Sequence, residues 1–164
     1  MPSDSVDDLG AMIPMAYFDS AYVIKCYVPE TGSADVRRTA SRVERLVTSE
    51  LCRIEFSAAI HRKRREQQLT KREADVVLKQ FARDAEAYVW EFIPVSRAAI
   101  ERVCALFTSL PSTVSLRSAD AIHLVTAAEL GLTEIFSNDR QLLTGAPFLG
   151  LRGVDVIDAR GDHA

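Results

Sequence analysis

The sequence has few cysteines, no long apolar run and no excess of positive charge. Its three cysteines, Cys26, Cys52 and Cys104, are far apart in apolar sequence, so we expect buried reduced thiols rather than disulfides or a zinc site. No stretch approaches the ~20 apolar residues that a membrane-spanning helix needs. The start of the chain lacks the basic residues and apolar run of a secretory signal. These absences favour a cytoplasmic protein with no membrane partner.

The composition is that of one folded domain. The chain has 164 residues, of which 48% are hydrophobic and 26% are charged, enough for a single packed core. A net charge of −3 argues against attraction of the whole molecule to nucleic acid, although a local basic face remains possible. We expect a flexible acidic leader at 1–14, one domain at 15–158 and a short tail at 159–164.

Short apolar runs alternate with longer amphipathic ones. We expect strands at 15–19, 46–49, 88–95, 133–137 and 153–158. We expect helices at 21–28, 33–43, 51–68, 70–89, 97–110, 118–131 and 138–144. Predicted helix signals are the N-caps Ser20, Ser96 and Ser118, and a capping box formed by Thr70 and Glu73. Strands separated by helices require crossovers, so the pattern predicts an α/β fold in three layers (α/β/α) around a central, mainly parallel sheet.

Four acids are placed where this topology could gather them. Asp19 ends the first strand, and Asp139 follows the strand at 133–137. Asp120 lies in the first turn of a predicted helix, and Glu55 lies within another among apolar residues. Each also has a simpler explanation, because acids stabilise helix N-termini, occupy turns or tilt outward from amphipathic helices. Ligands of such sheets bind beyond the carboxyl ends of the strands, where these acids could meet.

A cluster of carboxylates indicates bound cations, because buried, unpaired acids cost several kcal/mol each. Oxygen-only ligands suit Mg²⁺ or Mn²⁺, whereas zinc favours His or Cys. Such ions lower the pKa of a bound water and stabilise the attacking and leaving oxygens of phosphodiester hydrolysis. No side-chain nucleophile is then needed, and the sequence shows no credible Ser–His–Asp or Cys–His arrangement.

Four segments together resemble the PIN-domain family, and in particular its VapC toxins. The segments are YFDSAYVIKCYVPE (17–30), SELCRIEFSAAIHR (49–62), RSADAIHLVTAAELG (117–131) and FSNDRQL (136–142). The similarity covers residues 15–158, and the third and fourth segments are the more specific. It implies a PIN fold and a Mg²⁺ (or Mn²⁺) site made by Asp19, Glu55, Asp120 and Asp139, which would be both catalytic and metal-binding. It also implies RNA cleavage by water attack, a VapB-like antitoxin as partner and a homodimer.

Several other residues are candidates for secondary roles. Ser137 and Ser20 are expected to support the site. Lys25, Arg117 and Arg140 are candidates for contact with substrate phosphate.

The remaining notable residues have a structural and a functional interpretation. The basic run at 61–65 is either a solvated helix end or a surface for RNA or a partner. His123 is expected to be structural rather than a metal ligand or a general base. Trp90 and Tyr88 are expected in the core or in a dimer contact.

The sequence leaves two rival functions open. One is a non-catalytic PIN-like domain that only binds RNA or protein, although the presence of all four acids counts against it. The other is a phosphatase or a receiver domain. The first would need an Asp-x-Asp at Asp19, and the second would need paired acids ahead of the first-strand Asp. Neither pattern is present.

Overall fold

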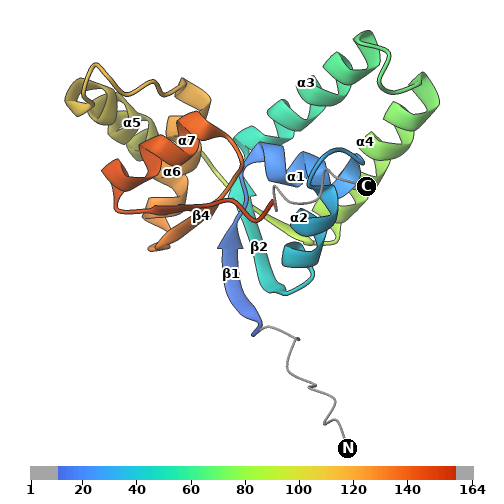
Figure 1. Ribbon diagram of the computed structural model, residues 1–164, viewed down its shortest axis with the longest axis horizontal. Helices are drawn as coiled ribbons and strands as arrows, with labels where there is room; N and C mark the ends of the chain where they lie inside the picture. Colours follow the sequence, from blue (N-terminus) through green and yellow to red (C-terminus); the bar gives the residue numbers. More distant parts are fainter. Residues whose placement is uncertain (1–10, 158–164) are drawn as a thin grey trace, which may run out of the picture.

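The computed structural model describes residues 11–157 and confirms the α/β class (Figure 1). Its strands are β1 (Ile13–Tyr17), β2 (Val43–Ser49), β3 (Trp90–Ile93), β4 (Glu134–Phe136) and β5 (Arg152–Val154). Its helices are α1 (Ser20–Tyr27), α2 (Ser33–Ala40), α3 (Leu51–Arg65), α4 (Lys71–Glu86), α5 (Arg97–Ser109), α6 (Ser118–Glu129), α7 (Arg140–Gly145) and the 3-10 turn η1 (Ala146–Leu149). No helix in this part of the chain is long and apolar enough to cross a bilayer.

All strand pairs are parallel, as the helical crossovers predict. One sheet has the order β1-β2-β3, and β4 pairs with β5 in a second. A single parallel bridge between Phe18 and Phe136 joins the two, so the strands follow one another as β3-β2-β1-β4-β5. The junction between the sheets therefore lies directly beside Asp19.

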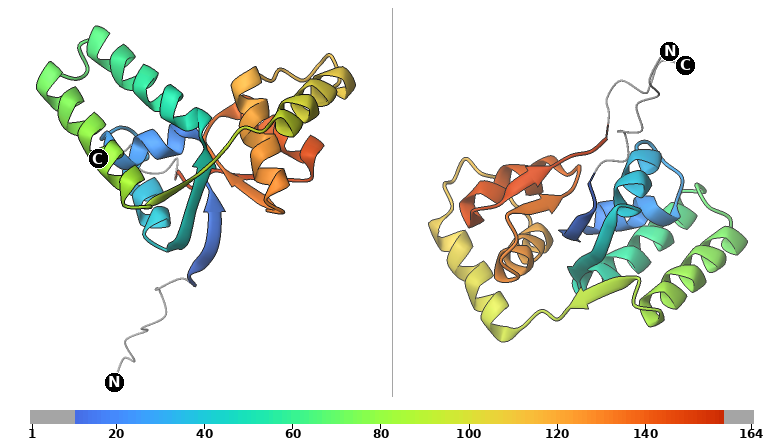
Figure 2. Two further views of the ribbon diagram at one scale, coloured as in Figure 1. Left: turned by 180° about the vertical axis from the view of Figure 1, so that it is seen from behind. Right: turned by 90° about the horizontal axis from the view of Figure 1, so that it is seen from below.

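Helices cover both faces of the sheet, and the alternation of side chains along β1 shows how. Ala16 and Phe18 pack into a core with α1, α2, α3 and α4, whereas Tyr17 packs with α6 and α7 on the other face. A third cluster lies between α5 and α6. The views in Figures 1 and 2 show the α3–α4 hairpin and the α5–α7 group as two bodies projecting on either side of the strands.

Several predicted boundaries differ from the structure. The last two residues of the predicted leader, at 13–14, belong to β1, while 1–10 lie outside the described residues. The predicted helix at 70–89 ends at Glu86, because Tyr88 adopts a left-handed φ of 57° that ends the helix. Strand β3 consequently starts at Trp90, and β5 is shorter than predicted; residue 158 and the tail at 159–164 lie outside the described range.

Two helix signals are confirmed and two are wrong. The capping box of Thr70 and Glu73 is present, and Ser96 caps α5. Ser20 and Ser118 are not N-caps but the first residues of their helices. Asp19 caps α1 instead, because its carboxylate accepts the hydrogen bond from the backbone N–H of Tyr22 at the start of the helix.

The expectations for the cysteines and aromatics are partly confirmed. All three cysteines are free thiols, but Cys52 is buried whereas Cys104 is exposed. Trp90 is buried and donates its indole N–H to the hydroxyl of Tyr27 at 2.8 Å. Tyr88 is 89% exposed, so the core alternative for it is wrong.

Candidate active site

Two of the four acids project from the junction between the sheets. Asp19 follows β1, and its backbone N–H donates to the carbonyl of Phe136 at 3.1 Å, which ties it to β4. Asp139 follows β4 and caps α7 by accepting from the backbone N–H of Gln141 at 2.8 Å. Because β1 and β4 are adjacent and parallel, their carboxyl ends bring the two acids to the same edge.

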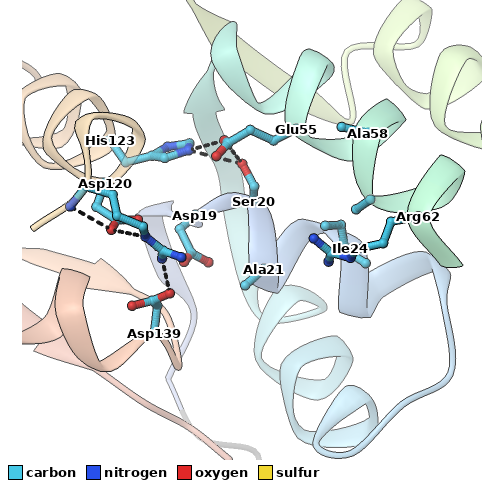
Figure 3. Close-up of a pocket in the computed structure, with 12 residues that line it drawn as sticks. Asp19, Ser20, Ala21, Ile24, Glu55, Ala58, Arg62, Asp120, His123 and Asp139 are labelled. Carbon is cyan, nitrogen blue, oxygen red and sulfur yellow. Dashed lines mark hydrogen bonds and ion pairs between the residues drawn. The ribbon is translucent and has the colours of Figure 1, made fainter. Parts of the chain in front are cut away.

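The other two acids come from helices on opposite sides of that edge. Glu55 lies in α3, immediately before the buried Phe56, and Asp120 lies in the first turn of α6. The four carboxylates line a pocket of about 290 Å³ together with Ser20, His123, Arg62, Arg117 and four apolar residues (Figure 3). The structure thus brings together all four acids that the sequence singled out.

Asp19 is an enclosed carboxylate. Its side chain accepts hydrogen bonds from the hydroxyl of Ser137 and from the backbone N–H of Tyr22 at 2.9 Å. Burial outweighs these two hydrogen bonds and raises the pKa of Asp19 to about 6. A nearby divalent cation would offset this cost of burying the charge. Ser137 is fully buried and lies beside Asp19, in the site where the sequence placed it.

Glu55 is held by two donors. The hydroxyl of Ser20 donates to Oε2, and Nε2 of His123 lies 2.6 Å from the same oxygen. Burial alone raises the pKa of Glu55, but the hydrogen bonds from His123 and Ser20 lower it below its ordinary value. Ser20 therefore acts on Glu55 rather than as the cap of α1.

His123 links this carboxylate to the core. Its Nδ1 lies 2.8 Å from the hydroxyl of Tyr17, and both side chains are almost fully buried. An ionised carboxylate only accepts hydrogen bonds, so the proton between His123 and Glu55 is on Nε2. When the imidazole is neutral, Nδ1 accepts the hydrogen bond from the hydroxyl of Tyr17. Sequence reasoning treated His123 as structural and did not connect it with Glu55.

Arg117 joins the remaining two acids. Its Nε and Nη2 form a fork onto the carboxylate of Asp120, at 2.8 and 3.2 Å, and Nη2 also pairs with Asp139. The side chain of Arg117 is 59% exposed, whereas that of Asp120 is 9% exposed. The guanidinium therefore neutralises two site carboxylates from the solvent side.

The donor set suits Mg²⁺ or Mn²⁺ in its chemistry, because four carboxylates with no thiolate surround one pocket. The side chains are nevertheless paired with donors of the chain itself. Within residues 11–157, no three His, Cys, Asp or Glu side chains converge closely enough to hold a metal ion. Arg117 lies between Asp120 and Asp139, and Glu55 is turned toward His123.

The three candidates for phosphate contact are placed differently. Arg117 lines the pocket, but Lys25 is buried and donates to the carbonyl of Thr31 at 2.9 Å. Arg140 is exposed at the start of α7 and does not line the pocket. Arg62 does line it, and among the described residues its side chain makes no ion pair; the sequence offered it only as part of the basic run at 61–65.

Known proteins share this sequence pattern and this fold. Residues 16–146 match the family model of the PIN domain. Two proteins of Mycobacterium tuberculosis, named ribonuclease VapC45 and ribonuclease VapC49, are each 31% identical to the chain over 143 residues, which is 85% of this chain and 94% of the relative.

Two solved structures share the fold at low sequence identity. One is VapC20 of Mycobacterium tuberculosis, described as a toxin that cleaves the sarcin–ricin loop. It is 15% identical and covers 84% of this chain and 98% of its own, with a TM-score of 0.65. The other is VapBC2 of Rickettsia felis bound to a DNA fragment from its promoter. It is 14% identical and covers 86% of this chain and 98% of its own, with a TM-score of 0.58.

Proposed function

The chain belongs to the PIN-domain family, and from that membership we propose that it is a metal-dependent endoribonuclease acting as the toxin of a toxin–antitoxin pair. The observation that carries the proposal is the meeting of four acids from four separate segments in one pocket. Structural explanations suffice for each acid alone, but gathering four carboxylates is unfavourable without cations. The relatives named ribonuclease VapC supply the type of reaction.

We assign the metal-holding role to Asp19, Glu55, Asp120 and Asp139. The chemistry that Mg²⁺ or Mn²⁺ supplies when bound is a lowered pKa for the attacking water and neutralisation of charge at the phosphodiester. The protein's own groups orient this set. Ser137 holds the carboxylate of Asp19, and the other three acids are likewise held by hydrogen bonds or ion pairs before any substrate arrives.

The proposed substrate is RNA, bound by its phosphates at the basic rim of the pocket. Arg62 lines both the acidic pocket and the neighbouring one, which also contains Lys63. A phosphate chain crossing from one pocket to the other would therefore meet Arg62 near the scissile bond. Arg117 and Arg140 remain candidates for further contacts, whereas the burial of Lys25 and its bond to Thr31 favour a structural role.

The decisive experiment is cleavage of a panel of structured RNAs by the purified protein with Mg²⁺, with Mn²⁺ and with EDTA. Asp120→Asn should reduce cleavage by at least about a hundredfold, since several kcal/mol of charge stabilisation depends on the metal. Asp75→Asn changes an exposed acid on α4 outside the pocket and should leave the rate unchanged. Full activity of Asp120→Asn would refute the site.

A binding-only role is the alternative, and one observation favours it. The acids do not converge on a metal position in the described arrangement. RNA binding without cleavage under any of these metal conditions would establish that alternative.

We further propose a VapB-like antitoxin as partner, a homodimer as the oligomeric form and the cytoplasm as the place of action. The VapC relatives and the VapBC2 assembly support the antitoxin. Expression of the chain alone should arrest growth, and co-expression with the product of a neighbouring small reading frame should restore it. Light scattering of the purified chain measures the oligomeric state directly.

A further inference from the structure

Arg117 binds the same carboxylates that the proposed metal site requires. Its fork engages both oxygens of Asp120, and its Nη2 also engages Oδ2 of Asp139. The other oxygen of Asp139 caps α7. The oxygens of these two acids that face the pocket are therefore already paired with a cation of the chain itself.

The arginine reaches these acids from solvent and is free to leave them. Its side chain is 59% exposed, whereas the side chains of Asp120 and Asp139 are 9% and 27% exposed. Its backbone is extended just before α6, and the long side chain has several rotatable bonds. The guanidinium lies on the solvent side of both carboxylates, so an outward turn takes it into water. Because the arginine itself is exposed, this ion pair is more open to water and to screening by salt than a pair in which both partners are buried.

We propose that Arg117 is the resident counter-ion of Asp120 and Asp139 and that a divalent metal must displace it. The inference rests on the proposed function, because it takes these acids as metal ligands. The guanidinium of Arg117 and the metal compete for one set of carboxylate oxygens. The larger the fraction of molecules in which Arg117 occupies these oxygens, the lower the apparent affinity for the metal. Arg117 also relieves repulsion between the two acids while no metal is bound.

The proposal predicts an increase in metal affinity when a site residue is removed. Arg117→Gln should bind Mn²⁺ about two- to fivefold more tightly than the wild-type chain, the range expected for loss of an ion pair with one exposed partner. The same variant should be less thermally stable in EDTA and should gain more stability from Mn²⁺. Arg117→Lys keeps the charge without the fork and should fall between the two.

The experiment is titration of the full chain with Mn²⁺ alone, without RNA, reading free Mn²⁺ by electron paramagnetic resonance. Arg62→Gln is the matched control. It removes a cation from the same pocket that, in the part of the chain described, pairs with none of the four acids. A change confined to Arg117→Gln therefore measures competition, and an equal change in both variants would reflect only the lost charge.

Each outcome decides the matter. Tighter binding in Arg117→Gln than in Arg62→Gln supports the proposal. If Arg117→Gln is folded by circular dichroism but binds Mn²⁺ no more tightly than Arg62→Gln, the proposal is overturned, while the metal site itself is not. Absence of Mn²⁺ binding in every form overturns the metal site of the proposed function and this inference with it. If Arg117→Gln does not fold, the comparison of Arg117→Lys with the wild type decides in the same way.

Discussion

Asp19 shows how one residue combines structural and chemical roles. Its carboxylate caps α1 through the N–H of Tyr22, and its backbone N–H links β1 to β4. Only 4% of the residue is exposed, and burial raises its pKa to about 6. The folded metal-free protein therefore holds the proton of Asp19 more tightly than the unfolded chain does, since the ordinary value is 3.8.

This shift has a defined effect on stability. Because the pKa of Asp19 is higher in the folded state than in the unfolded chain, protonation of Asp19 stabilises the fold. This stabilisation is complete below about pH 4 and is lost as the pH rises through about 6. In EDTA, Asp19→Asn should remove this pH dependence. At pH 8 it should raise the free energy of unfolding by about 2–3 kcal/mol, from a shift of about two pKa units. Urea denaturation at pH 5 and pH 8 measures the effect. An unchanged pH slope would contradict it.

The hydroxyl of Tyr17 offers a second test at this scale. Tyr17→Phe leaves Nδ1 of His123 without its donor, which should cost about 1–3 kcal/mol of stability. Without this hydrogen bond the imidazole no longer holds the carboxylate of Glu55 in one orientation. The affinity for Mn²⁺ should therefore fall by roughly tenfold, as it does when other groups that orient a metal ligand are removed. The measurements are thermal unfolding and Mn²⁺ titration.

Tyr27→Phe is the matched control for this experiment. Tyr27 is also a tyrosine whose hydroxyl makes side-chain hydrogen bonds, but its partners, Asp84 and Trp90, do not line the acidic pocket. The partner of Tyr17, His123, does line it. The control should lose stability and keep the affinity for Mn²⁺. Equal losses of affinity in both variants would show that Tyr17 acts only through the fold.

The sequence predicted which acids lie together in the candidate site better than it predicted their hydrogen-bond partners. Asp19, Glu55, Asp120 and Asp139 lie together as expected, because strand ends and helix starts can be inferred from apolar periodicity. The bond from Tyr17 to His123 joins residues 106 positions apart, which no local pattern encodes. Sequence periodicity indicates that a histidine faces the core but does not identify its hydrogen-bond partners.

At the scale of elements, α3 carries Glu55 into the pocket because its other face is anchored to α4. The rings of Phe56 in α3 and Phe81 in α4 stack with centroids 3.9 Å apart. Tyr27 of α1 packs edge-on against both rings. The residue adjacent to Glu55 is thus fixed by three helices, and the direction of the carboxylate follows from that packing.

Phe81→Ala tests this anchoring from a residue outside the pocket. Loss of the buried ring should lower the free energy of unfolding by about 3–5 kcal/mol. The hairpin should loosen before the whole domain unfolds, so amide exchange in α3 and α4 should increase more than in α6. Val76→Ala, at a 60% exposed position of the same helix, should change stability by less than about 0.5 kcal/mol. Equal exchange rates across all helices would exclude local loosening.

Element boundaries were harder to predict than element types. The end of α4 depends on the left-handed backbone of Tyr88, a conformation that an aromatic residue seldom adopts and that composition does not indicate. Strand β2 starts at Val43, earlier than its β-branched centre suggested, because Ile13 pairs with Val43 in the register of β1. The first boundary follows from a local backbone conformation and the second from strand pairing, and apolar periodicity indicates neither.

At the scale of the whole molecule, the pocket lies between two bodies of the fold. Glu55 is on the α3–α4 side and Asp120 is on the α5–α7 side, with Asp19 and Asp139 at the strand ends between them (Figure 3). A cation bound by acids from both sides would connect the two bodies. Metal binding and global stability should therefore be linked.

Mn²⁺ should raise the stability of the wild-type chain, by about 2.7 kcal/mol when free Mn²⁺ is a hundred times the dissociation constant. Glu55→Gln and Asp120→Asn, one from each body, should each lose most of this gain, whereas Asp75→Asn should keep it. Calorimetry with Mn²⁺ and with EDTA gives the comparison. A gain that is unchanged in Glu55→Gln and lost in Asp120→Asn would show that α3 does not take part.

The order of the acids along the chain has a consequence for biosynthesis. β1, β2 and β3 with Asp19 and Glu55 lie within residues 13–93, while Asp120, Asp139 and the β4–β5 pair come later. Because ribosomes release the N-terminal part first, a nascent chain holds only two of the four carboxylates for much of its translation. The four acids of the proposed site therefore come together only after both halves have emerged from the ribosome, a delay during which another protein can bind the nascent chain.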